Sequence, residues 1–325
     1  MKNAPIRPRF IVFAHQYNPD SGGVIALHYL CHLLNKAGFE SFLIPSFNST
    51  EISPLDPKDF LHGLPTIASF KGTSYRVHKG WETPLYKQSW RSIATASNVV
   101  VIYPEVIFGN PLRAKNIARW ILCEPGFHTP EVFFTRGEIH FRYLEMHLVV
   151  PMPWIEIANQ LLTVNYVPWE HYYPPPTHSP RSGTAYLVRK GINKPLVHDT
   201  TNSIKIDGMN HKQIGEIFRR VETFISYDTK TMYSPLAAIA GADSVVIPDE
   251  GVCESDWQPR EELRAGLAYG FERLAWAQST KHLTGEVLRQ LELKSYQSVV
   301  AFARFWEHRL GLEPSDVGGS AENIG

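Results

Sequence analysis

The sequence has few cysteines, no net charge and no long apolar run, and each of these absences excludes a class of protein. Cys31, Cys123 and Cys253 lie far apart and form no C-x-x-C pair, so we expect reduced thiols rather than a disulfide framework. Lys plus Arg and Asp plus Glu number 32 each, so no global field recruits nucleic acid. No segment approaches the ~20 apolar residues of a membrane span, and Phe10 to Ala14 is too short for the core of a signal peptide. We therefore expect a cytoplasmic globular protein.

Several catalytic motifs are also missing. The sequence contains no H-E-x-x-H, Walker A, G-x-S-x-G or G-x-G-x-x-G pattern, which excludes the readily recognised metalloproteases, P-loop NTPases, serine hydrolases and NAD enzymes. His28 and His32 stand four residues apart beside Cys31, as two zinc ligands would. No third ligand is positioned by the sequence, so the flank of an amphipathic helix is favoured and no metal site is predicted.

The most informative stretch that is present runs from Tyr227 to Gly251. An apolar, β-favouring run at 222–227 precedes an Ala-rich helical segment at 236–240, and a second strand follows at 244–247. A strand, short helix and strand of this kind pair in parallel with a right-handed crossover. The loops at 228–234 and 248–251 are therefore expected at the carboxyl end of one sheet, where open α/β sheets bind ligands.

Polar residues fill these two loops. A helix capped by Asp228 or Thr229 and flanked by Thr231 and Ser234 would offer N–H groups and hydroxyls to a phosphate. On the second loop, Asp249 and Glu250 could accept hydrogen bonds from sugar or ribose hydroxyls. A capped helix and a solvated acidic turn are the ordinary alternatives, and they remain open at this point.

A group of cations follows another predicted strand, 184–188. Arg189, Lys190 and Lys194 surround Gly191 at its end. Such cations could neutralise a diphosphate, in particular the charge of a leaving diphosphate, or they could form a solvated basic turn.

The N-terminal half alternates strands and helices in the same way. Strands are predicted at 9–14, 40–44, 98–103 and 119–123, and helices at 24–34 and 110–118, which indicates a doubly wound domain. His15 directly follows the first strand, where it could act as a general base at neutral pH, or simply be hydrogen-bonded within a loop. Asp20 could orient it or serve as the base itself. Glu105 and Glu124 close two further strands, and the sequence does not choose among these groups.

Proline and composition set the predicted boundaries. The chain divides into a Rossmann-like domain at 1–168, a Pro-rich linker at 169–183 and a second Rossmann-like domain at 184–295. A helix at 296–312 carries one apolar stripe and is expected to pack on the core or across the domain junction. The polar tail, 313–325, is expected to be disordered.

This layout resembles a GT-B glycosyltransferase, in which two Rossmann-like domains face each other across a cleft. Gly22-Gly23 after the first strand resembles the first-domain loop of that family, and LAAIAGADSVVIPDEG at 236–251 is similar to its donor-binding helix, strand and closing Glu-Gly turn. The segments ISYD at 225–228 and AYG at 268–270 look like those of bacterial enzymes that build surface polysaccharides. Many members carry a glutamate where this chain has Ala237, which leaves ribose recognition to other residues or indicates another nucleotide or a lost activity.

The resemblance implies a metal-independent hexosyl- or deoxyhexosyltransferase without a cofactor. It would move a sugar from a nucleotide-diphosphate donor to a glycan or lipid-linked acceptor during surface polysaccharide assembly. It would act in the cytoplasm or at the inner face of the membrane, beside other assembly enzymes. A nucleotide-sugar epimerase of similar fold and a non-catalytic glycan-binding scaffold are the alternatives. If the enzyme inverts, His15 or Asp20 would be the catalytic base that deprotonates the acceptor hydroxyl. The donor would meet these residues: Gly22, Gly23, Lys190, Lys194, Tyr227, Asp228, Thr229, Thr231, Ser234, Glu250 and Gly251.

Overall fold

The computed structural model divides the chain into two compact units. It describes residues 7–46, 75–128, 132–145, 147, 149, 152–174 and 180–314. Unit 1 comprises Met1–Tyr166 and Glu292–Gly325, and unit 2 comprises Val167–Leu291. Val167 and Tyr172 are buried in the core of unit 2, so the segment predicted as a linker from residue 169 contributes to that core at its start. The predicted tail from residue 315 lies outside the described residues.

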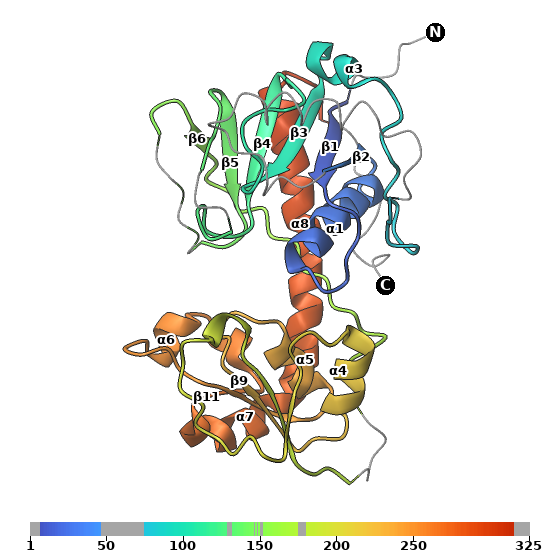
Figure 1. The fold of residues 1–325 in the computed structure, drawn as a ribbon. Helices are drawn as coiled ribbons and strands as arrows, with labels where there is room; N and C mark the ends of the chain where they lie inside the picture. The colour runs from blue at the N-terminus through green and yellow to red at the C-terminus, as the bar shows by residue number, and fades with distance from the viewer. Residues whose placement is uncertain are drawn as a thin grey trace. The chain divides into compact units, whose positions relative to one another are not determined.

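Unit 1 is built on a six-stranded parallel sheet with the order β2-β1-β3-β4-β5-β6 (Figure 1). The strands are β1 (Arg9–Ala14), β2 (Glu40–Pro45), β3 (Val99–Pro104), β4 (Asn116–Ile121), β5 (Glu138–Arg142) and β6 (Glu156–Ile157). Among the residues described between β1 and β6, the helices are α1 (Gly22–Lys36) and α3 (Trp90–Thr95). The chain leaves β1 through α1 to β2 and then crosses to β3 on the other side, so the topological switch point lies between β1 and β3.

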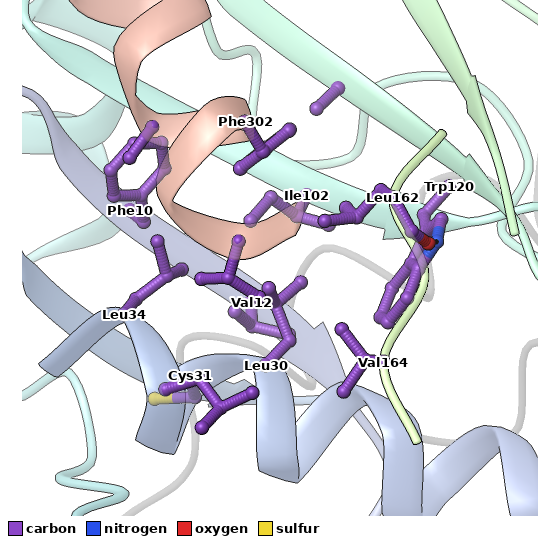
Figure 2. Packing of buried hydrophobic residues seen from close by; sticks show 14 of the residues in the cluster. Phe10, Val12, Leu30, Cys31, Leu34, Ile102, Trp120, Leu162, Val164 and Phe302 are labelled. Carbon is purple, nitrogen blue, oxygen red and sulfur yellow. Dashed lines mark hydrogen bonds between the residues drawn. The ribbon is translucent and has the colours of Figure 1, made fainter. Parts of the chain in front are cut away.

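The two faces of this sheet are covered by different helices. Alternate residues of the central strands, such as Phe10, Val12 and Ile102, pack against α1 and against Phe302 of the last helix (Figure 2). The intervening residues of these strands form a second cluster that includes Ile93 of α3. Because strand side chains alternate in direction, these near-continuous apolar runs serve both layers, as expected for a parallel sheet.

Unit 2 repeats the plan with a five-stranded parallel sheet in the order β11-β10-β9-β7-β8. Its strands are β7 (Thr184–Leu187), β8 (Ser203–Lys205), β9 (Thr223–Ser226), β10 (Asp243–Val246) and β11 (Leu267–Tyr269). Its helices are α4 (His211–Phe218), α5 (Tyr233–Ile239), α6 (Glu254–Trp257) and α7 (Leu274–Thr280), with 3-10 turns at Arg189–Gly191, Glu261–Arg264, Phe271–Arg273 and Lys281–Leu283. Helices α4 and α5 pack on one face and α7 on the other, and the switch point lies between β7 and β9.

One long helix, α8 (Thr284–Arg309), belongs to both units in sequence (Figure 1). Its start contributes Leu288 to the core of unit 2, and its second half contributes Tyr296, Val299 and Trp306 to the core of unit 1. The predicted α/β class, with two Rossmann-like domains and a helical C-terminal segment, is confirmed. Among the described residues, no helix is both long and apolar enough to cross a membrane.

Two predicted helices differ from the structure. Residues 110–118 form a turn followed by β4, because the Asn110 side chain bonds both the N–H and the carbonyl oxygen of Ala114 and closes the turn instead of capping a helix. Gly22 and Gly23 are the first residues of α1 rather than the end of the preceding loop. Strand β4 accordingly begins at Asn116, inside the segment predicted as a helix, rather than at residue 119.

Candidate functional site

The carboxyl edge of the unit 2 sheet brings together most of the residues singled out by the sequence. Leu187, Ser226 and Val246 end their strands level with one another, because β7, β9 and β10 pair in register at these positions. The loops that follow β7, β9 and β10 therefore leave the sheet side by side. This is the edge at which a doubly wound sheet binds its ligand.

Three loops of this edge are joined through one carboxylate. The Lys194 ammonium lies 2.7 Å from Asp249 Oδ1 and donates to the carbonyl oxygen of Ile247 at 2.7 Å. Thr229 Oγ1 donates to Asp249 Oδ2 at 2.8 Å. Burial alone would raise the pKa of Asp249, but the hydrogen bonds from Lys194 and Thr229 outweigh it and hold the pKa below its usual value. Asp249 is thus a carboxylate anion bound to a cation and a hydroxyl.

An aromatic pair supports this junction from the next loops. The Trp257 indole N–H donates to the Thr229 carbonyl oxygen at 2.7 Å. The Trp257 ring stacks on Tyr269 at 4.7 Å between centroids, and the Tyr269 hydroxyl donates to the carbonyl oxygen of Val252 at 2.9 Å. Neither aromatic residue was predicted for the site, because the sequence offers only one aromatic residue after β10 and another at the end of β11.

Arg189 occupies an unusual backbone position at the end of β7. Its φ angle is +35°, in the left-handed region that residues other than glycine rarely adopt. The N–H groups of Val188 and Arg189 both donate to the Asp207 carboxylate, which fixes this conformation. The guanidinium lies over the Tyr233 ring at 5.0 Å, and both Arg189 and Lys190 are exposed. Strained residues of this kind concentrate at functional sites.

Other predicted donor residues shape the loop after β9. Tyr227 is fully buried, and its hydroxyl accepts from the Val197 N–H at 2.8 Å and bonds His198 Nδ1 at 2.7 Å. The Asp228 carboxylate accepts from the Lys230 N–H at 3.0 Å. Both residues therefore fix the course of the backbone under the exposed edge.

The start of α5 differs from its prediction. The N-cap is Met232 rather than Asp228 or Thr229, and Thr231 Oγ1 accepts from the Tyr233 N–H at 3.2 Å. Ser234 is buried, and in the described part of the chain its hydroxyl has no hydrogen-bond partner. Ala237, where the resembling family carries glutamate, is fully buried in the core of unit 2. Of the hydroxyls predicted here, Thr229 and Thr231 are the partly exposed ones.

Glu250 and Gly251 form the turn after β10. Both are exposed, and Gly251 has a φ angle of +73°, which explains the glycine in the Glu-Gly turn. Glu250 is the next residue in the sequence after Asp249, whose carboxylate joins Lys194 and Thr229.

In unit 1, the predicted catalytic residues follow β1 at the switch point. Burial lowers the pKa of His15, and a hydrogen bond with the Ser46 backbone acts in the opposite direction, so the imidazole is neutral at neutral pH. Asp20, Gly22 and Gly23 are exposed. In the described part of the chain no hydrogen bond joins His15 to Asp20, so Asp20 does not orient the imidazole through a direct contact.

Glu105, which follows β3 at the same edge, is largely buried. Burial raises its pKa, while N–H groups of residues 105, 122 and 123 bond the carboxylate and act in the opposite direction. The carboxylate thus closes the loop after β4, where Leu122 donates to it at 3.0 Å. Its oxygens are engaged by backbone, which favours His15 over Glu105 as a proton acceptor.

His28 and His32 have separate partners rather than a shared one. His28 Nε2 donates to the His15 carbonyl oxygen at 2.8 Å, and His32 Nδ1 accepts from the Glu82 N–H at 2.9 Å. Among the described residues, no three His, Cys, Asp or Glu side chains are grouped as metal ligands would be. Both histidines belong to an aromatic cluster around Trp81.

No protein-family model and no curated protein sequence matches the chain. Solved structures of glycosyltransferases are similar in backbone. T4 phage β-glucosyltransferase in complex with UDP-glucose aligns over 92% of this chain and 99% of its own, at 9% identity and a TM-score of 0.48. The kitacinnamycin glycosyltransferase aligns over 94% and 100%, at 11% identity and a TM-score of 0.40. Spinosyn rhamnosyltransferase, complexed with spinosyn aglycone, aligns over 92% and 96%, at 11% identity and a TM-score of 0.29.

Proposed function

We propose that the protein is a glycosyltransferase whose unit 2 binds a nucleotide-diphosphate sugar and whose unit 1 binds the acceptor. The observation that carries the proposal is the set of cations and hydroxyls at the unit 2 switch point. Arg189 and Lys190 follow β7, while Lys194 reaches the end of β10, and Thr229, which follows β9, shares the Asp249 carboxylate with it. A diphosphate with two or three negative charges is the ligand whose chemistry matches this edge.

The cations would act on the leaving group. As the acceptor oxygen bonds to the anomeric carbon, the bond from that carbon to the diphosphate oxygen breaks and the electron pair leaves with the diphosphate. Arg189, Lys190 and Lys194 would stabilise this developing charge. The ammonium of Lys194 has three donors, of which Ile247 and Asp249 accept two. One donor therefore remains for a phosphate oxygen.

The acceptor hydroxyl must lose a proton in the same reaction. His15 is a suitable acceptor for it because the neutral imidazole retains one basic nitrogen at neutral pH. Asp20, an exposed carboxylate on the same loop, is the second candidate. This assignment holds for an inverting enzyme; a retaining enzyme would not need such a base.

The sugar and the acceptor follow from the sequence motifs. Segments 225–228 and 268–270 resemble those of bacterial enzymes of surface polysaccharide assembly. We therefore propose transfer of a hexose or deoxyhexose to a glycan or lipid-linked acceptor, without an essential metal, in the cytoplasm or at the inner face of the membrane. Donor contacts in unit 2 would come from Thr229, Thr231, Glu250 and Gly251, while Tyr227, Asp228 and Ser234 would act through the loop they shape. Gly22 and Gly23 of unit 1 are also proposed for donor binding, because their loop resembles the first-domain loop of the GT-B family.

The test is binding of a panel of nucleoside diphosphates and their sugars, read by the shift in melting temperature and then by titration calorimetry. We expect one base to be selected and its affinity to fall at least tenfold in Arg189→Ala, because a charge-assisted contact is lost. Arg220→Ala is the matched control, since Arg220 precedes β9 and lies at the opposite edge of the sheet. A protein that binds none of the panel would contradict the proposal.

If the protein binds a nucleotide sugar, acceptor assays distinguish a glycosyltransferase from an epimerase. Consumption of the nucleotide sugar only in the presence of a glycan or lipid-linked acceptor indicates a transferase. Interconversion of two nucleotide sugars without an acceptor indicates an epimerase and contradicts the proposed reaction while retaining the donor site.

A further inference from the structure

Asp249 stands at the point where three loops of the unit 2 edge meet. Lys194 comes from the loop after β7, Thr229 from the loop after β9, and Asp249 itself from the loop after β10. Each oxygen of its carboxylate holds one of the other two side chains, at 2.7 Å and 2.8 Å.

The bonding pattern gives Asp249 a different task from that of a ligand contact. Both oxygens of Asp249 accept from protein donors, one from Lys194 and one from Thr229, so the carboxylate orients these two side chains whether or not it also accepts from a ligand. A lysine on a flexible loop loses side-chain freedom when it binds a phosphate, and this loss of entropy weakens binding. Lys194 is held before any ligand arrives, and its side chain is only 15% exposed.

We propose that Asp249 is a positioning residue that holds Lys194 and Thr229 in place as a preassembled binding pair for the donor's phosphates. The inference rests on the proposed function and names a residue that acts through two others. Two further hydrogen bonds hold the same two residues. The Lys194 ammonium donates to the Ile247 carbonyl oxygen, and the Trp257 indole N–H donates to the Thr229 carbonyl oxygen. A pair fixed in this way binds its ligand with less loss of entropy.

The opposite effect of Asp249 is also physically possible, and the sign of one measurement separates the two. A carboxylate beside Lys194 offsets part of the cation's charge and would compete with a phosphate. If competition dominated, removing the carboxylate would strengthen diphosphate binding. If positioning dominates, as inferred, removing it weakens binding, because the ammonium and the hydroxyl are no longer fixed.

The experiment titrates the full-length chain with the nucleoside diphosphate selected by the wild-type protein. We expect Asp249→Ala to weaken binding roughly tenfold or more. Asp249→Asn, which keeps the size of the side chain, should weaken binding less, and Asp249→Glu should restore part of the affinity. Asp256→Asn removes the same charge from exposed α6 and serves as the control.

A double-mutant cycle with Lys194→Met provides the readout that a purely structural role would not change. In the Lys194→Met background, Asp249→Ala should weaken diphosphate binding less than it does in the wild type, because only the contact with Thr229 remains to be lost. Equal or tighter binding by Asp249→Ala and Asp249→Asn, or fully additive losses, would overturn the inference. A wild-type protein that binds no nucleoside diphosphate would instead overturn the proposed function itself.

Discussion

At the scale of single residues, unit 1 contains a buried ion pair between Arg119 and Glu138. Both side chains are fully buried, and the guanidinium donates twice to the carboxylate at 2.8 Å. Burial alone would raise the pKa of Glu138, but hydrogen bonds from His140 and Arg119 and the charge of Arg119 lower it to about 2. Arg119 also donates to the carbonyl oxygens of Pro104 and Gly109, so it ties the loop after β3 to the sheet.

We expect Arg119→Met to lower the free energy of unfolding by about 3–5 kcal/mol, because it leaves the Glu138 carboxylate buried without its partner. Urea unfolding measures the change. The folded-state pKa of Glu138 lies below its unfolded value, so the stability it contributes is present above the unfolded pKa and is lost as the pH falls toward about 2. Arg9→Met, which removes the partly exposed pair with Glu40, is the control and should cost at most about 1 kcal/mol.

The histidines of the Trp81 cluster should make unit 1 sensitive to acid. Burial lowers the pKa of His28 and of His32 to about 4. Because these folded-state values lie below the unfolded one, stability is full above about pH 6.5 and falls as the pH drops toward 4. The slope is up to about 1.4 kcal/mol per pH unit for each histidine.

Unfolding of His32→Gln, compared with the wild type between neutral pH and about pH 5, measures this contribution. Glutamine keeps an acceptor for the Glu82 N–H and does not titrate. We expect the wild type to lose more stability over this range than the variant. Parallel pH profiles of the two proteins would show that His32 does not titrate as inferred.

At the scale of elements, one glycine, Gly215, allows helix α4 to pack closely against His171, near the start of unit 2. A Cβ on Gly215 would overlap the carbonyl oxygen of His171, whereas one on Gly285 at the start of α8 would meet only open space and the distant Arg289 side chain. We expect Gly215→Ala to lower the melting temperature. Gly285→Ala should leave it unchanged or raise it, since alanine is the better helix former by up to about 1 kcal/mol. Equal melting temperatures for the two variants would contradict this packing.

The elements that the sequence predicts well are those whose signal is local. The β9–α5–β10 unit follows from two apolar runs and an Ala-rich segment between them, and it pairs in parallel as predicted. Where α5 begins could not be read, because Asp228 and Thr229 bond to other groups, namely Lys230 and Asp249. Likewise, the helix predicted at 296–312 begins earlier, at Thr284, because no proline or glycine interrupts residues 286–310.

The candidate site shows the same division between local and distant information. His15, Arg189, Lys190 and Thr229 follow the ends of predicted strands, and these strand ends place them at the carboxyl edges of the two sheets. The strands themselves can be predicted from hydrophobic periodicity alone. The junction at Asp249 depends on side chains more than fifty residues apart in sequence, and no local pattern encodes such a contact. The left-handed conformation of Arg189 is equally invisible in the sequence, where a glycine would have been expected.

At the scale of the whole molecule, the order of the chain makes unit 1 dependent on residues that follow unit 2. Tyr296, Val299, Phe302 and Trp306 of α8 belong to the core shared by β1, β3 and α1. Figure 2 shows Phe302 in this core. Unit 2, by contrast, is one continuous segment with its own two hydrophobic clusters. A chain that ends at residue 291 should therefore lose the cooperative unfolding of unit 1.

The segment 167–291 provides the complementary prediction. All the proposed phosphate-binding residues belong to it, so the isolated segment should fold and bind the selected nucleoside diphosphate with an affinity within roughly tenfold of the full chain. Circular dichroism melting tests the folding, titration calorimetry tests the binding, and the same segment with Arg189→Ala is the control. A folded segment that fails to bind, beside a full chain that does, would show that the donor is held by residues of unit 1 as well. In that case the cations at the end of β7 could not account for the donor site alone.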